Sequence, residues 1–335
     1  MFENLLESVS RDRLLVARKR LIERIGDGAI ACSLGTLRES IGSDFFTKIT
    51  SDVAHKRAMI GFDNVPNADV WRKIATVTAA NDFKLQRAQR SGSYASLDLV
   101  PEDAPYTVKK FKEAEENWRV QKYGNIEAWS LEAMANDELG RLGRTMERFG
   151  AAAARTVLNF VFNTLIDANP TLGNDSTTLF HANHNNLVSG ALSLATLESA
   201  WNKLRTQTGD DGEKLDLVPR FLIVNPDAEV IAHRLVGSAM LITGNTTTEA
   251  AGNFFNGRLE VIATNYVTSG NSYLAADPSQ IDTVEVGFFR GQQKPTTSVE
   301  VKGSGHEFEF DSMRTKTRYI FGGAPLDYRW IVKMA

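Results

Sequence analysis

Residues 139–170 read LGRLGRTMERFGAAAARTVLNFVFNTLIDANP, and this stretch predicts most of an unusually long helix. Apolar residues recur in it every three or four positions, as one buried face of a helix requires. Ser130 is a suitable N-cap residue upstream, and Asn169-Pro170 ends the pattern. We therefore predict a helix over residues 130–168, about 58 Å long at roughly 1.5 Å per residue. The apolar positions are Leu139, Leu142, Met146, Phe149, Ala153, Val157 and Phe160.

The chain that leads into this helix, from Trp71 to Trp129, predicts a strand-like ribbon. Apolar and polar residues alternate around Phe83 and again around Trp118, with turn-forming residues between them. A hairpin with charge on both faces is marginal alone in water, so we expect it to project and to pack against a neighbouring copy. The candidate assembly contacts are Lys109, Lys110, Lys112, Glu113, Glu115, Glu116, Trp118 and Arg119.

Beyond Pro170 the pattern mixes helices and strands, which predicts an α+β fold. We expect helices over 194–207 and 228–236 and strands over 220–224, 259–264, 272–276 and 283–289, followed by a strand-rich C-terminal part.

Composition excludes several classes of function. The chain has 335 residues, a formal net charge of −3, 42% hydrophobic and 24% charged residues, which is typical of a globular protein. A free nucleic-acid-binding protein would normally be strongly basic. Cys32 is the single cysteine, so an intrachain disulfide is excluded. The first residues lack a secretory signal, and no apolar run approaches the roughly 20 residues of a membrane span, so we expect a cytoplasmic protein without membrane contact.

Residues 11–25 predict an amphipathic helix with a crowded basic face. Two interpretations stay open: a basic arm that contacts nucleic acid or an acidic partner, or a helix face that is simply solvated. The basic residues are Arg11, Arg13, Arg18, Lys19, Arg20 and Arg24.

The densest polar cluster lies at residues 180–186, around His181 and His184. Two histidines three residues apart supply too few ligands for a metal site, so a turn whose side chains satisfy backbone groups is favoured. The sequence has no GxSxG, GxxxxGK or GxGxxG motif, which disfavours a hydrolase or a nucleotide-binding enzyme. We expect no catalysis, no cofactor and no bound metal.

Several segments, taken in order, resemble the major capsid proteins of tailed phages. The chain is most similar to the Mu-like major head subunits and to the capsid half of prohead protease–capsid fusions, from about Arg38 to the C-terminus. The segments are Trp71–Ile74, Asn81–Lys84, Leu97–Glu102, Tyr123–Asn125, Asn136–Gly140, Leu179–Asn186 and Leu326–Trp330.

This resemblance implies the Hong Kong 97 phage capsid fold. It assigns residues 1–70 to an N-terminal arm, 71–129 to an extended loop, and 130–189 with 286–335 to a peripheral domain that contains the spine helix 130–168. Residues 190–285 would form the axial domain, and the basic arm at residues 11–24 would face the interior.

The resemblance also implies a function. Subunits would assemble as hexamers and pentamers into an icosahedral head around double-stranded DNA, bound without sequence specificity. The head would form in the host cytoplasm, and the protein would reside in the virion capsid. Implied partners are a scaffold, a prohead protease, a portal and, left open, a decoration protein. The fusion members carry a protease upstream, for which this chain has no room before Arg38, so a separate protease is implied. No sequence mark identifies a Lys–Asn crosslink. The alternative is an encapsulin-like shell of the same fold that encloses a cargo protein.

Overall fold

The computed structural model describes residues 54–90, 97, 99–103, 105–106, 114–130, 141–210, 212–242, 250–300 and 312–335. The predicted basic arm at residues 11–24 and the ribbon residues Lys109, Lys110, Lys112 and Glu113 lie outside this part.

The described elements mix helices and strands, which confirms the predicted α+β class. Residues 54–63 are helical. The helices are η1 (Val70–Lys73), α5 (Arg141–Asn159), η2 (Phe160–Asp167), η3 (Ala182–His184), α6 (Leu194–Arg205) and α7 (Pro226–Gly237). The strands are β1 (Ala75–Ala80), β2 (Gln86–Arg90), β3 (Ala114–Trp118), β4 (Gln121–Ser130), β5 (Leu187–Val188), β6 (Pro219–Val224), β7 (Met240–Ile242), β8 (Ala250–Gly252), β9 (Glu260–Ala263), β10 (Ser272–Ala276), β11 (Val284–Phe289), β12 (Thr296–Val299), β13 (Ser312–Pro325) and β14 (Ile331–Met334).

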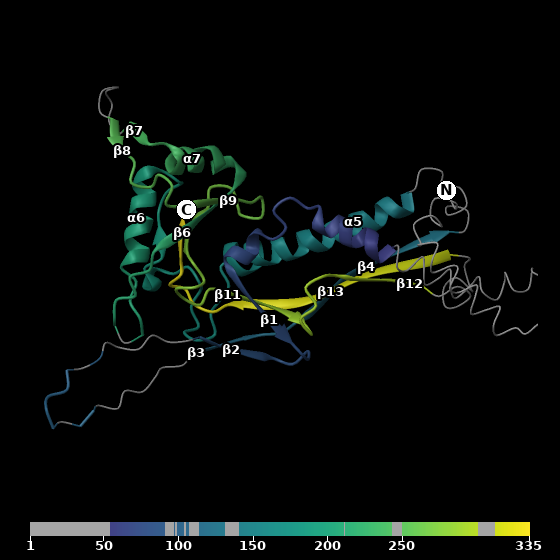
Figure 1. Ribbon diagram of the computed structural model, residues 1–335, viewed down its shortest axis with the longest axis horizontal. Helices are drawn as coiled ribbons and strands as arrows, with labels where there is room; N and C mark the ends of the chain where they lie inside the picture. Colours follow the sequence, from purple (N-terminus) through teal and green to yellow (C-terminus); the bar gives the residue numbers. More distant parts are fainter. Residues whose placement is uncertain are drawn as a thin grey trace, which may run out of the picture.

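The first five-stranded sheet runs in the order β1-β11-β13-β12, with β4 on the other side of β13. Strands β4 and β13 form a long antiparallel ladder from Ser312↔Ser130 to Phe321↔Gln121. The long helix α5 lies along these two strands (Figure 1). Aromatic rings fill the space between them, including Phe160 edge-on to Phe321 at 5.3 Å between ring centroids.

The predicted long helix is present over its described part. Helix α5 continues directly into the π-helix η2, so the helical segment runs from Arg141 to Asp167 and ends before Pro170, as predicted. Ser130 is the last residue of β4 and residues 131–140 lie outside the described part, so the role of Ser130 as the N-cap stays a prediction. The apolar face predicted from the spacing is buried at Met146, Ala153 and Val157.

A short helix, residues 54–63, crosses α5 at close range. A Cβ atom added at Gly150 would lie 1.8 Å from the carbonyl oxygen of Ala58, and one added at Gly61 would lie 1.9 Å from that of Glu147. Each helix therefore contributes a glycine at the crossing, and the two backbones approach more closely than larger residues would allow.

The helical segment Arg144–Asp167 is long and apolar enough to cross a membrane by length and composition alone. The expectation that no apolar run reaches this length was therefore wrong. Half of its most apolar window is buried inside the protein, and core helices of globular proteins meet the same criterion.

The second five-stranded sheet has the order β5-β14-β10-β6-β9 and is buried on both faces. On one face, Leu222, Leu274 and Val332 pack under helices α6 and α7. On the other face, Ile223 and Tyr273 join the cluster that contains the end of the long helix. All five residues of β10 are consequently buried, which explains why apolar residues follow Ser272 along the strand without a charge. Strand β14, at the C-terminal end of the chain, pairs with β10 in this second sheet.

The predicted ribbon over 71–129 was too long. Trp71 is buried, and β1 pairs in parallel with β11 inside the first sheet. Strand β4 also belongs to that sheet. The two-stranded ribbon itself is formed by β2 and β3, which pair from Gln86↔Trp118 to Arg90↔Ala114. The physical reason is that β1 pairs with β11 and β4 pairs with β13 inside the first sheet, whereas β2 and β3 pair with each other and do not extend that sheet.

Candidate assembly site

Strand β3 places alternate side chains on opposite faces of the ribbon. Ala114, Glu116 and Trp118 are buried, whereas Glu115 and Arg119 are exposed. The ribbon was predicted to carry solvated charge on both faces, and this is wrong at its base because one face packs against the subunit. Glu116 and Trp118 therefore form contacts within their own subunit. An assembly role for Glu115 and Arg119 stays a prediction.

The carboxylate of Glu116 is fixed by a backbone turn of the same subunit. Its side chain is only 5% exposed. The amide of Gly173 donates to Oε2 at 2.8 Å, and the amide of Asn174 donates to Oε1 at 3.0 Å. Two amide donors on one carboxylate satisfy most of what burial removes from it. Glu116 thus ties β3 to the turn that follows the long helix.

Trp118 seats the end of β3 on the first sheet. A Cβ atom added at Gly287 of β11 would lie 1.8 Å from Cη2 of the indole, so the ring needs a glycine beneath it. Trp118 packs there in a small apolar cluster with Ala80, Ala88 and Leu326.

The partner strand, β2, is held by a cluster of four charges, of which Arg90, Asp327 and Arg329 are buried and Asp210 is partly exposed. Arg90 contacts Asp210 at 2.7 Å and Asp327 at 3.4 Å, and its side chain is 4% exposed. Arg329 contacts both of the same carboxylates. Two cations and two anions balance, which removes the penalty of an unpaired buried charge. Burial raises the pKa of the Asp327 carboxyl, and the neighbouring Arg329 and Arg90 act in the opposite direction.

His184 connects the two anchors. Its Nε2 lies 2.6 Å from Oδ2 of Asp175, in the same turn that holds Glu116. Its ring stacks on Tyr328 at 3.8 Å between centroids, and Tyr328 lies between Asp327 and Arg329 in the chain. Both ribbon strands therefore end on one connected group of residues.

The remaining contacts of residues 180–186 confirm the turn interpretation of this segment. His184 Nδ1 lies 3.1 Å from the carbonyl oxygen of Leu179, and the amide of Asn183 donates to Nδ1 of His181. The side chain of Asn186 also donates to the Leu179 carbonyl oxygen at 2.8 Å.

The pKa of Asp175 is held below its usual range. Desolvation by burial is the largest single influence and pushes the pKa upward. Hydrogen bonds from Thr177 and the contact with His184 together outweigh it.

The loop beyond the ribbon strands exposes large apolar side chains. Leu97 is 99% exposed, Leu99 95% and Tyr106 85%. In Figure 1 the described residues of this loop lie well away from both sheets. Exposed apolar groups gathered on one projecting segment indicate a surface that another molecule covers.

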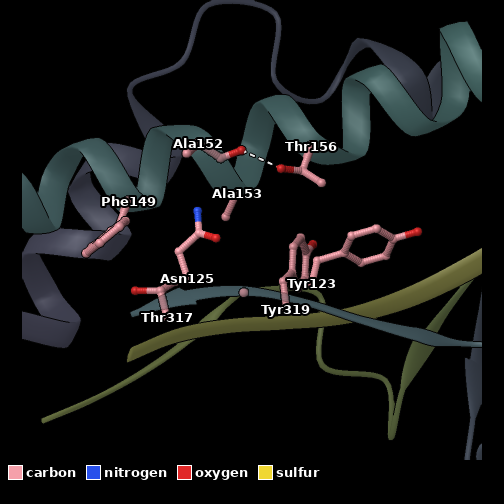
Figure 2. Close-up of a pocket in the computed structure, with 9 residues that line it drawn as sticks. Tyr123, Asn125, Phe149, Ala152, Ala153, Thr156, Thr317 and Tyr319 are labelled. Atoms are coloured by element: carbon pink, nitrogen blue, oxygen red, sulfur yellow. Dashed lines mark hydrogen bonds between the residues drawn. The ribbon is translucent and has the colours of Figure 1, made fainter. Parts of the chain in front are cut away.

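The hollow under the long helix is too small for a small-molecule ligand. It holds about 50 Å³ between α5 and the strands β4 and β13. Figure 2 shows Phe149, Ala153 and Thr156 of the helix facing Tyr123 and Tyr319 of the strands. Ligand pockets are usually several hundred Å³, so this space is a packing gap.

The residues that hold β2 and β3 in place were not identified from the sequence, although two of them could be recognised from their sequence context. Asp327 and Arg329 are charged residues inside an otherwise apolar C-terminal run, and such charges are usually paired when buried. The segments around His184 and around Tyr328 carry the resemblance described above, and in space they contact each other. Arg90 and Asp210 carry no comparable mark.

Comparisons with known proteins give consistent results. The model of the family described as phage capsid protein matches residues 113–334. The major capsid protein of Escherichia phage Mu is 32% identical over 80 residues, which are 24% of this chain and 25% of the Mu protein. The alignment thus spans about a quarter of that relative's length.

Solved structures show similarity over most of the chain. The capsid structure of the cyanophage P-SCSP1u has a TM-score of 0.52 at 11% identity, covering 79% of this chain and 86% of that one. A chain of Mycobacterium phage Adephagia has a TM-score of 0.51 at 12% identity, covering 80% and 89%. A chain of Microbacterium phage Oxtober96 has a TM-score of 0.51 at 9% identity, covering 78% and 89%. At these identities the likeness concerns the fold.

Proposed function

The chain belongs to the phage capsid protein family, and from this we propose that its copies assemble as hexamers and pentamers into a closed icosahedral head around double-stranded DNA. The protein is then a structural component of the virion capsid. Its contribution is to bind further copies of itself, and no step of that task requires catalysis or a cofactor.

The projecting loop is the observation that carries the proposal. Leu97, Leu99 and Tyr106 are almost wholly exposed, and burying a large apolar side chain stabilises a contact by about 1.5–3 kcal/mol. The base of the ribbon is fixed to its own subunit by Arg90 and Glu116, while these apolar side chains of the loop stay exposed. Exposed apolar side chains on one segment favour association with a partner molecule. We take that partner to be a second copy of the chain.

The division into parts is proposed with one revision. We assign 1–70 to an N-terminal arm, 130–189 with 286–335 to a peripheral part and 190–285 to an axial part. The extended loop is narrowed from 71–129 to the segment between β2 and β3 with those two strands. We further propose an interior position for the basic arm, assembly in the host cytoplasm, and a scaffold, a protease and a portal as partners.

Electron microscopy of the full chain, expressed alone and with its genomic neighbours, tests the proposal. Closed shells are expected from the wild type. The variant Leu97→Ser/Leu99→Ser/Tyr106→Ser should lose closed shells at least about tenfold, because two or three buried apolar contacts per interface disappear. Its thermal unfolding should match the wild type, since these side chains are exposed in the subunit.

A matched control uses apolar residues that are exposed elsewhere. Leu187→Ser/Val218→Ser removes two such side chains from the second half of the chain and should leave shell yield within about twofold. Equal shell yield from the loop variant and the wild type would rule out the loop as the contact. Nuclease-resistant DNA inside the shells supports a genome container, whereas a protein cargo without DNA would favour the encapsulin-like alternative.

A further inference from the structure

A groove lined by arginines runs between helix 54–63 and α5, on the side of the long helix away from the first sheet. Its volume is about 410 Å³, and Arg144, Arg148 and Arg155 line it together with Gly61 and Pro66 of the crossing segment. All three arginines are exposed. The groove exists because the glycines at the helix crossing bring the two backbones close together.

The three arginines form one stripe along α5. They are separated by four and by seven residues, which returns a helix to nearly the same direction. The buried residues Met146 and Val157 occupy the opposite side. The stripe extends about 16 Å along the helix axis from Arg144 to Arg155, given a rise of about 1.5 Å per residue.

Charges around the stripe do not neutralise it. Glu147 is the acidic residue that lines the groove, and Arg57 of the crossing helix already contacts it at 2.7 Å. Asp63 on the same helix contacts Lys294 at 3.0 Å. None of the three arginines forms an ion pair with another residue in the described part of the chain. A surplus of three positive charges on one face is notable in a chain whose formal net charge is −3.

We propose that this stripe binds the phosphate backbone of double-stranded DNA, without sequence specificity, on the interior face of the shell. The inference deepens the proposed function and rests on it. Duplex DNA carries one negative charge per about 1.7 Å of axis, so a stripe of about 16 Å faces enough phosphates for every guanidinium. Arginine also binds phosphate through paired N–H donors.

The lining favours DNA over an acidic protein. Protein-binding surfaces are usually centred on buried aromatic or large aliphatic anchors. The groove instead has Val65, Pro66 and Ala151 between its charged residues, with no aromatic side chain among its lining residues. A protein that binds the phosphate backbone of DNA, without reading the bases, needs only contacts from cationic side chains.

Binding of a fluorescent 30-base-pair duplex to the full-length protein, titrated at several salt concentrations, tests the proposal. Each phosphate contact contributes about −0.9 to the slope of log affinity against log salt, so three contacts give about −2.7 and roughly a 40-fold loss between 50 and 200 mM salt. Arg144→Gln/Arg148→Gln/Arg155→Gln should remove that part of the slope. Two duplexes of unrelated sequence should behave alike.

The matched control removes the same charge from other faces. Arg87→Gln/Arg234→Gln/Arg258→Gln replaces three exposed arginines and should change affinity by less than about twofold. Thermal unfolding of both triple variants shows whether each is folded. If the two triple variants lose affinity equally, binding reflects net charge alone and the stripe is not the site.

Two further outcomes separate the alternatives. Polyglutamate of matched charge should compete poorly; a stripe-dependent affinity for polyglutamate above that for DNA would overturn the choice of partner. If shells form and the stripe variant binds DNA as well as the wild type does, this inference is wrong. The proposed function would not be affected by that result. Absence of shells from the wild type with its genomic neighbours would instead end the proposed function.

Discussion

The base of the ribbon and the loop beyond it belong to one stretch of chain but are built on opposite principles. At the base, charged side chains such as Arg90 and Glu116 are buried and each has partners within the subunit. In the loop, apolar side chains such as Leu97 and Leu99 are almost wholly exposed. The usual distribution of polar and apolar residues is inverted at both places. The difference separates what fixes the ribbon to its own subunit from what remains for another molecule.

The largest effect on the subunit is expected at the buried charge cluster. Arg90→Ala removes a cation that contacts Asp210 and the buried Asp327, so we expect a loss of about 3 kcal/mol in the free energy of unfolding. Chemical denaturation of subunits kept unassembled measures it. Arg87→Ala, three positions before Arg90 on the same strand and 73% exposed, is the control and should change stability by less than about 0.5 kcal/mol. Equal losses in both variants would contradict the anchor described for β2.

A smaller loss is expected at the partner strand. Glu116→Ala leaves the amides of Gly173 and Asn174 without their acceptor, at about 1–3 kcal/mol. Its neighbour Glu115 is exposed, so Glu115→Ala should stay within about 0.5 kcal/mol in the same denaturation experiment. A Glu115 variant as unstable as the Glu116 variant would mean that the faces of β3 are assigned wrongly.

The smallest effect concerns pH. The pKa of Asp175 is lowered in the folded chain, so its contribution is present above the unfolded-state pKa of about 3.9 and disappears as pH falls through the folded-state value. The stability difference between wild type and Asp175→Asn should therefore shrink between pH 5 and pH 3, by less than about 1 kcal/mol because a third of the side chain is exposed. Thermal unfolding across this range checks it, with the exposed Glu198→Gln of α6 as the control for loss of one carboxylate. A constant difference would argue against the pairing with His184.

Elements that depend on local pattern were predicted well from the sequence. The end of the long helix at residue 167, the strand at 272–276 and the helix that begins at Leu194 after its cap Ser193 all agree with the structure. In each case the apolar spacing and the capping residue lie within one element. The resemblance to tailed-phage capsid proteins is likewise confirmed at the level of family and fold.

Features that depend on distant partners could not be predicted. The burial of Arg90 is set by Asp210 and Asp327, which lie far along the chain, and no local pattern marks the three as neighbours. The ribbon was drawn too long because the pairing of β1 with β11 is a long-range contact. Glu116 was expected to contact a neighbouring copy, because alternation along a strand shows two faces without showing which one the subunit covers.

The pairing of β1 with β11 also affects how a subunit folds during its synthesis. Ala75 of β1 pairs with Val284 of β11. The ribosome synthesises β1 early, so β1 cannot form these hydrogen bonds until most of the chain has been made. The ladder of β4 with β13 closes at a later stage of synthesis, because Ser130 pairs with Ser312. Topologies dominated by such non-local contacts fold slowly, and their unpaired strand edges are prone to aggregation until they pair. In a cell that makes many copies at once, folding must therefore be faster than the aggregation of incomplete subunits.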